Sequence, residues 1–372
     1  MQKTTLTKIL QAELEPFLQT HKLPAHKIKT LKQYSVCRTA ALGGHSQYCE
    51  NGHKMGVWYN SCKRRGCPQC QSLPTERWLN YQKERLLDTT HHHWVFTLPH
   101  QFLDLWRYNR VLLQNVLYSA VADTLKLLAR DERYLNAKPA FLLTLHTWGR
   151  NLSLHPHIHC LIADGGLNQA GDWTQPKKKC LFPAKVMSQL VRGKFLAYLR
   201  AADTLKLPPD LAANHYRTLL NKLGRIDWVV HCCKPYRHGK GVVTYLSRYV
   251  KRGAVKNSQL RHYKGQVTLG YQSHRTNSRQ TLKLDSNAFI QRLVDHIPPR
   301  GKPTFRYYGL YHPCCCKALD QARIQHGQSV VTTTAPITCE AYAENFPNKP
   351  VCPICNAPAI ASISEANSRT SS

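Results

Sequence analysis

Two strand-like runs separated by a short loop constrain the fold of this chain more than any other feature. The first, AFLLTLHTW, covers 140–148, and the second, HPHIHCLIA, covers 155–163. Both are rich in the apolar and aromatic residues that favour strands. The residues between them, from Gly149 to Leu154, suit the loop of a hairpin. The sequence therefore predicts two antiparallel neighbouring strands.

Four histidines lie in this predicted hairpin. Side chains alternate between the faces of a strand, so His155, His157 and His159 point to one face. A turn centred near 151–152 would place His146 opposite His157. Three imidazoles with open coordination positions are typical of a catalytic metal site. We interpret His157, His159 and His146 as the ligands, with His155 as a competitor for the third place and hydrogen-bonded structural histidines as the alternative.

The charge balance points to a polyanionic partner. Lys and Arg number 52 against 21 Asp and Glu, a formal charge of +31. Self-repulsion of this size is usually offset by a polyanion, and nucleic acid is the first candidate. No apolar run approaches the ~20 residues that span a bilayer, and the N-terminus lacks the apolar core of a signal peptide. We expect a soluble intracellular protein with no membrane partner.

The 15 cysteines gather near the two ends of the chain. Five lie between 37 and 70, and six lie between 314 and 355. Clustered cysteines in a reducing compartment bind metal more often than they form disulfides. We therefore expect metal at both ends, with a different function between them.

The N-terminal cluster predicts a structural zinc site. Cys67 and Cys70 form a CPxC knuckle, and Cys49 and His53 form a second short pair. Tetrahedral zinc takes four such ligands from two pairs separated by a loop. We predict a site of Cys49, His53, Cys67 and Cys70, with Cys62 as a fifth candidate that could replace His53.

Two further features accompany the cysteines. The run KRRG gives the N-terminal module a basic surface suited to DNA phosphates, formed by Lys63, Arg64 and Arg65. The run VCPIC near the C-terminus supplies Cys352 and Cys355 for a possible second zinc site. The other half of that site would come from Cys314, Cys315, Cys316 or Cys339.

The run GVVTYLSRYVKRG predicts a helix over 241–251. Tyr245 and Tyr249 are four residues apart and therefore neighbours on one face, beside Arg248 and Arg252 and away from the apolar stripe. Two tyrosines flanked by arginines suit nucleophilic attack on a phosphodiester better than core packing. Nearby cations favour the phenolate. Ordinary amphipathic packing is the alternative.

These features combine into one chemistry. A cation such as Mg²⁺ or Mn²⁺ would polarise a phosphate oxygen, and a tyrosine oxygen would attack phosphorus. The products are a 5′-phosphotyrosine and a free 3′-hydroxyl, and two tyrosines allow two such links.

Six stretches in a fixed order resemble a known family. They span 38–311 and are RTAALGGHSQYCENGHKMGVWYNSCKRRGCPQCQ, HWVFTLP, LTLHTWGRNLSLHPHIHCLIADGG, WVVHCCKP, YLSRYVKR and FRYYGLY. The sequence resembles the two-tyrosine HUH transposases of the insertion sequence 91 family. The resemblance implies His157 and His159 as the HUH pair and Tyr245 and Tyr249 as the nucleophiles. The family usually has a second cysteine in the first knuckle, where this chain has CENGH.

The resemblance also implies the fold and the biology. We expect an α+β protein with an antiparallel-sheet HUH endonuclease core, preceded by a small zinc-binding domain. The expected divisions are a helical leader and zinc-binding domain at 1–90, a nuclease domain at 91–310, and a Cys-rich segment with a disordered tail at 311–372. Rolling-circle-like transposition would act on single-stranded DNA at element ends and targets. The expected location is the bacterial cytoplasm, at the nucleoid.

Two other functions are compatible with parts of the sequence. A replication initiator or relaxase would share the chemistry and differ in its biological use. A non-enzymatic zinc-dependent DNA-binding protein would account for the charge and the cysteines. It would leave the histidine strand and the tyrosine pair without a purpose.

Overall fold

The computed structural model describes most of the chain. The residues outside the description are 1, 178–180, 237–240, 242–252, 274–275, 333–334, 339–340, 343–350, 358 and 365–372. The predicted nucleophiles and their neighbouring arginines, Tyr245, Arg248, Tyr249 and Arg252, lie outside the described residues, as does Cys339.

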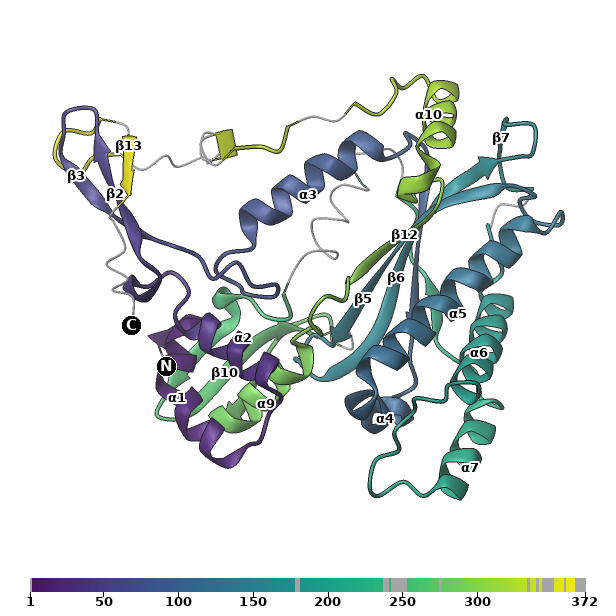
Figure 1. Cartoon of the computed structure of the whole chain (residues 1–372), viewed down its shortest axis with the longest axis horizontal. Coiled ribbons are helices and arrows are strands. Elements are labelled where there is room, and N and C mark those ends of the chain that lie inside the picture. Colours follow the sequence, from purple (N-terminus) through teal and green to yellow (C-terminus); the bar gives the residue numbers. More distant parts are fainter. Residues whose placement is uncertain are drawn as a thin grey trace.

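An antiparallel sheet forms the centre of the molecule (Figure 1). Its strands lie in the order β12 (Phe305–Gly309), β5 (Lys138–Trp148), β6 (Leu154–Leu167), β4 (His91–Thr97) and β8 (Val230–Cys232), and β7 (Trp173–Thr174) pairs with β6. The predicted hairpin is β5–β6. Its register places His146 directly opposite His157, which confirms the predicted pairing. The predicted α+β fold with an antiparallel sheet is also confirmed.

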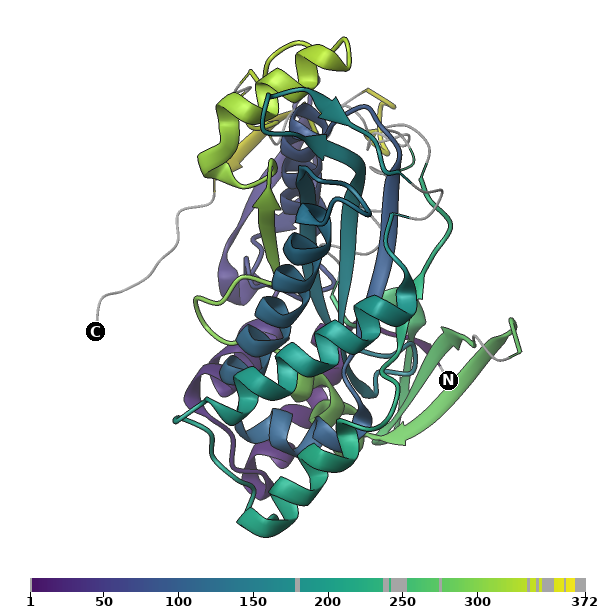
Figure 2. The ribbon, with the colours of Figure 1, turned by 90° about the vertical axis from the view of Figure 1, so that its right-hand side faces the viewer.

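Helices cover both faces of this sheet. Helices α5 (Arg110–Arg130) and α6 (Ala184–Arg200) lie across one face, in front of the strands in Figure 2. Ile158 and Cys160 of β6 share the core on that side. Helices α3 (Ser72–Arg85) and α10 (Cys316–Gln325) pack on the other face. Alternation along β6 therefore turns His157 and His159 away from α5.

Helix α5, with 21 residues, is the longest helix among the described residues. It is the one helix found there that is long and apolar enough to cross a membrane, and 61% of its apolar window is buried inside the molecule. Burial of this extent is typical of a core helix, and α5 contributes Leu113, Leu117 and Leu125 to the core beneath the sheet.

A second unit combines the N-terminal helices with a later part of the chain. Helices α1 (Leu6–Thr20) and α2 (Ala25–Ser35) pack with α9 (Ser286–His296) in one buried cluster. The four-stranded sheet of this unit has the order β1 (Gln2–Lys3), β9 (Leu260–Tyr263), β10 (Gln266–Gln272) and β11 (Arg279–Asp285). The predicted domain boundary at residue 90 remains a prediction, since this core joins residues from both sides of it.

The third sheet combines strands from the N-terminal and C-terminal parts of the chain. Strands β2 (Gly44–Cys49) and β3 (Lys54–Tyr59) form a hairpin, and β13 (Ala359–Ser364) pairs with β2 (Figure 1). Strand β13 includes the first two residues of the tail predicted to be disordered, 363–372. The open edge of β2 offers backbone hydrogen-bonding groups that pair with this segment, and the disorder of the tail stays a prediction.

Short elements complete the described structure. They are η1 (Ala40–Leu42), η2 (His100–Phe102), α4 (Leu103–Tyr108), α7 (Ala213–Leu223), η3 (Asn257–Gln259) and η4 (Pro313–Cys315).

Candidate functional site

Three imidazoles of the β5–β6 hairpin converge on one point. One ring nitrogen from each of His146, His157 and His159 lies within 4.8 Å of the others, and the Nε2 atoms of His157 and His159 are 3.1 Å apart. The register explains this arrangement, because His146 faces His157 across the strand pair and His159 is two residues further along the same face. The structure thus brings together all three predicted ligands.

His155, the predicted competitor, has a different position. Its side chain is exposed, and it is not part of the converging group. Its backbone carbonyl instead accepts a hydrogen bond of 2.7 Å from Nδ1 of His157. His155 therefore orients a candidate ligand through its backbone.

The local environment suits these rings for a cation. Because Nδ1 of His157 donates to a carbonyl, its Nε2 carries the free lone pair. Burial lowers the pKa of His157 to about 4 and holds the pKa of His159 well below its ordinary value. Both rings are therefore neutral at pH 7, which is the state of imidazole that binds metal.

A fourth histidine, His93, contacts the ring nitrogen of His159 that points away from the converging group. His93 was not among the predicted site residues. Nε2 of His93 is 2.9 Å from Nδ1 of His159, and the two rings stack with centroids 5.2 Å apart. Strand β4 places His93 opposite Leu161, and therefore on the histidine face of β6. A partner on the second ring nitrogen is the usual way to fix a metal-binding imidazole. The signal in the sequence was the run HHHW at 91–94, which overlaps the family stretch HWVFTLP.

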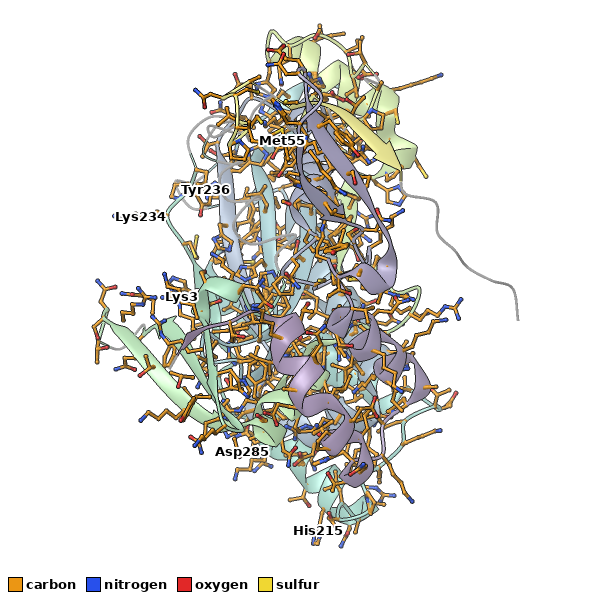
Figure 3. All side chains as sticks on the ribbon, turned by 90° about the vertical axis from the view of Figure 1, so that its left-hand side faces the viewer. Lys3, Met55, His215, Lys234, Tyr236 and Asp285 are labelled. Carbon is orange, nitrogen blue, oxygen red and sulfur yellow. The ribbon has the colours of Figure 1, made fainter. Side chains whose placement is uncertain are left out.

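The segment that contains Tyr245 and Tyr249 lies between two described residues, Tyr236 and Gly253. Before it, Tyr236 forms a bridge with His91, and its ring lies 6.2 Å from that of His93; Figure 3 labels Tyr236. After it, Gly253 lies beside the first cysteine cluster, which consists of Cys37, Cys62, Cys67 and Cys70. A Cβ at Gly253 would lie 2.5 Å from the carbonyl oxygen of Gly66, the residue before Cys67. The chain thus leaves the histidine face at one end of this segment and meets the cysteine cluster at the other.

A cavity of about 1400 Å³ connects the histidine face with the same cysteine cluster. His146 and Trp148 line it from β5, and Cys70 and Gly253 line it from the other side. None of the described lining residues is acidic. The cationic ones are Arg38, Lys63, Arg65, Arg77, Arg110 and Lys302.

The three predicted DNA-contacting residues of the KRRG run differ in their surroundings. Lys63 and Arg65 are exposed and line the cavity. Arg65 also donates to the carbonyls of Lys302 and Pro299, at 2.7 and 3.2 Å. Arg64 is not among the lining residues and donates to the side chain of Gln33. Two of the three are thus placed to face a ligand in the cavity.

The first cysteine cluster contains Cys37, Cys62, Cys67 and Cys70, whose sulfur atoms all lie within 4.8 Å of one another. Sγ of Cys67 is 3.5 Å from that of Cys37, and Sγ of Cys62 is 3.7 Å from that of Cys70. Cys37 was missed because it has no partner cysteine within ten residues on either side. Four thiols at these separations suit tetrahedral zinc.

The predicted grouping of Cys49 and His53 with Cys67 and Cys70 is wrong. Cys49 and His53 lie at the tip of the β2–β3 hairpin, whereas Cys62 follows its base. A strand of six residues spans about 20 Å, so one ion cannot reach both places. The tip residues instead join a second cluster with Cys352 and Cys355.

The predicted partners of Cys352 and Cys355 are also corrected. Cys314 and Cys315 lie in η4 and Cys316 begins α10, and none of the three belongs to either cluster. Cys315 accepts a hydrogen bond of 3.1 Å from Nζ of Lys138. The residues that lie beside Cys352 and Cys355 in the structure are Cys49 and His53, some 300 positions away in sequence.

Two family models match the chain. Residues 9–98 match the transposase zinc-binding domain named for insertion sequence 91, and residues 140–318 match the model described as "Putative transposase". The first range contains Cys37, Cys62, Cys67 and Cys70, and the second contains the three converging histidines. Cys352 and Cys355 lie beyond both ranges.

Two relatives cover most of the chain. "Putative transposase y4qJ" of Sinorhizobium fredii is 37% identical over 292 residues, which are 76% of this chain and 73% of the relative. The transposase for insertion sequence element IS801 of Pseudomonas savastanoi pv. phaseolicola is 34% identical over 295 residues, 76% of this chain and 70% of the relative. No solved structure matches the chain significantly.

Proposed function

This chain belongs to the transposases of the insertion sequence 91 family, and from that premise we propose that it cuts and rejoins single-stranded DNA at the ends of its element through a 5′-phosphotyrosine. Membership of this family means that the chain is an enzyme that acts on DNA and that it carries a zinc-binding domain. The observation that carries the finer proposal is the convergence of His146, His157 and His159.

The three imidazoles would hold a divalent cation. When bound, the cation supplies positive charge that polarises a non-bridging phosphate oxygen. The donor set fits this role, because the nitrogens converge and the rings are neutral at pH 7. Mg²⁺ prefers oxygen ligands, whereas imidazole suits transition metals. We therefore expect Mn²⁺ to support cleavage better than Mg²⁺.

The covalent step uses a tyrosine of the segment between Tyr236 and Gly253. The phenolate oxygen of Tyr245 or Tyr249 attacks phosphorus, the bond from phosphorus to the 3′ oxygen breaks, and that oxygen takes up a proton. Attack by another 3′-hydroxyl on the phosphotyrosine restores a phosphodiester and releases the phenol. The positions of the two flanking residues, one beside His93 and one in the cavity, support a tyrosine within reach of the histidines.

The cavity offers a path for a single strand. Its lining combines six Lys and Arg side chains with the aromatic rings of Trp148 and Phe305 and has no acidic side chain among the described residues. Cationic grooves with aromatic side chains are typical of single-strand binding, because every base can stack on a ring. The first cysteine cluster would place Lys63 and Arg65 along the same path.

A cleavage assay tests this proposal. The full chain would be incubated with a labelled strand from an element end, or with its duplex, in Mn²⁺, Mg²⁺ or EDTA. We expect cleavage of the single strand alone, dependent on the metal and lost in His157→Ala. His155→Ala serves as the matched control and should retain cleavage. Cleavage that persists in His157→Ala or in EDTA would contradict the metal role.

A further inference from the structure

The second cysteine cluster has the dimensions of a zinc site. Sγ of Cys49 is 3.6 Å from Sγ of Cys355 and 3.5 Å from Nδ1 of His53. That nitrogen is 3.4 Å from Sγ of Cys355 and 3.8 Å from Sγ of Cys352. A tetrahedron with Zn–S bonds of about 2.3 Å has S···S edges of about 3.8 Å. The four atoms therefore match the ligand positions around one ion.

A disulfide does not account for this cluster. A disulfide requires sulfur atoms about 2.05 Å apart, and Cys49, Cys352 and Cys355 are all free thiols. Their sulfur atoms and the imidazole nitrogen form one compact group of ligand atoms. Zinc is the ion that three thiolates and one imidazole favour.

Both pairs of ligands lie on tight turns that point backbone N–H groups at sulfur. The N–H of His53 lies 3.3 Å from Sγ of Cys49, and the N–H of Ile354 lies 3.4 Å from Sγ of Cys352. The positive φ angles of Gly52 and Asn356, 77° and 59°, make these turns possible. Hydrogen bonds of this kind favour the charged form of the thiol, which is the form that binds metal.

The surrounding apolar core is too small to hold the two segments together by itself. It consists of the buried residues Cys49, Cys352 and Ala357, with Met55 and Cys355 partly buried against them. Figure 3 labels Met55 on β3, the strand on the other side of β2 from the yellow strand β13. Units this small usually need a metal or a disulfide to fold. Strand β13 nevertheless pairs with β2 from Ala359 to Ser364.

We propose that Cys49, His53, Cys352 and Cys355 bind a second structural zinc ion, which fastens the C-terminal segment to the N-terminal hairpin. This site is separate from the first cysteine cluster, and half of its ligands lie outside both family matches. The ion closes a loop of about 300 residues, since Cys49 and Cys355 are 306 positions apart. The residues of the proposed nuclease, 91–310, lie inside that loop. The chain segments before and after them therefore both connect to the β2–β3 hairpin.

Zinc analysis of the full chain tests the proposal. Cys49→Ser and Cys352→Ser should each lower the zinc content by one equivalent relative to the parent, and the double variant should lose no more than either single variant. Cys314→Ser is the matched control, because this exposed thiol lies in the C-terminal segment outside the cluster. His53→Cys should keep the zinc, since it supplies a fourth thiolate.

Hydrogen exchange gives a second readout that shows the joining of the two segments. Cys49→Ser should speed the exchange of backbone amides in β13. Cys352→Ser should speed the exchange of the β2 amides that face β13. Loss of zinc in Cys49→Ser but not in Cys352→Ser would overturn the proposal, because the site would then be confined to the N-terminal region. Unchanged zinc in both variants would overturn it as well. Neither readout requires DNA cleavage, so failure of the proposed nuclease function would leave this test intact.

Discussion

Nε2 of His93 lies 2.9 Å from Nδ1 of His159, so that one histidine of β4 braces a candidate ligand on β6. The two strands are neighbours in the sheet. Val95 lies opposite His159, and His93 is two residues before Val95 on the same face. Burial lowers the pKa of His93 to about 4, which keeps it neutral at pH 7. A neutral His93 can accept a hydrogen bond from Nδ1 of His159 at its Nε2, which leaves Nε2 of His159 for the cation.

Replacing His93 should therefore weaken the metal site without removing a ligand. We expect His93→Ala to reduce Mn²⁺ affinity and cleavage by about 10- to 100-fold, as is usual for partners that orient a ligand. His92→Ala is the matched control, because His92 pairs with Asp164 at 2.9 Å and lies on the other face of the strand. Mn²⁺ titration and cleavage rates measure the effect. Equal losses in both variants would argue against a specific role for His93.

The third ligand can be identified by comparing two histidines. His146→Ala should reduce Mn²⁺ affinity by more than His93→Ala does, because it removes a converging nitrogen. His155→Ala should leave the affinity unchanged, since its contribution to the site comes from its backbone carbonyl. Calorimetric titration of both variants decides between them. The reverse pattern would restore His155 as the third ligand.

His296 should make the fold sensitive to acid. Burial lowers its pKa to about 3, whereas the unfolded value is near 6.5. Between these values the unfolded chain binds a proton that the folded chain does not, so the free energy of unfolding falls as the pH falls. A single group of this kind contributes about 1.4 kcal/mol per pH unit.

Denaturant titrations of the zinc-loaded protein test this prediction. Between pH 6.5 and 5.5 the parent should lose about 1 kcal/mol more than His296→Gln, which cannot titrate, because the unfolded ring is only partly protonated at the start of this range. The buried ring contacts Oγ1 of Thr147 and the carbonyl of Leu152, both at 3.2 Å, and an amide can preserve such bonds. Parallel losses in the two proteins would show that His296 is not the titrating group.

Lys63 should contact the DNA backbone more directly than Arg64. Lys63 is exposed in the cavity, whereas Arg64 is engaged with Gln33. Lys63→Gln should weaken single-strand binding and reduce the slope of log K against log salt by about 0.7, the value for one phosphate contact. Arg64→Gln should change the slope less. Fluorescence anisotropy at several salt concentrations gives the slope for each variant. Identical slopes for Lys63→Gln and Arg64→Gln would argue against binding of DNA in the cavity.

The convergence of His146, His157 and His159 could be predicted from the sequence because all three lie in one hairpin. Strand alternation and a short loop are enough to fix which residues face each other, and His146 does face His157. His93 could not be assigned in the same way. Its role depends on β4 lying beside β6, and the order of strands in a sheet is set by packing of the whole domain.

The cysteine clusters show where local spacing fails. Cys49–His53 and Cys67–Cys70 are equivalent short pairs in sequence, and nothing local indicates that a hairpin separates them. Cys37 completes the first cluster from the end of α2, and Cys352 and Cys355 complete the second from the far end of the chain. Each pair of ligands was recognisable, but its partner depended on tertiary structure.

The most direct test of the central claim is the search for a covalent protein–DNA adduct. End-labelled single strands from the element's own termini would be incubated with the full chain in Mn²⁺ or EDTA and separated by denaturing electrophoresis. We predict an adduct through the 5′ phosphate of the fragment downstream of the cut, which carries the label at its 3′ end. The adduct should require Mn²⁺ and disappear in the Tyr245→Phe, Tyr249→Phe double variant, with the single variants identifying the nucleophile of each cut. Tight binding of the correct terminal strand with no adduct, or an adduct that survives in the double variant, would contradict the account.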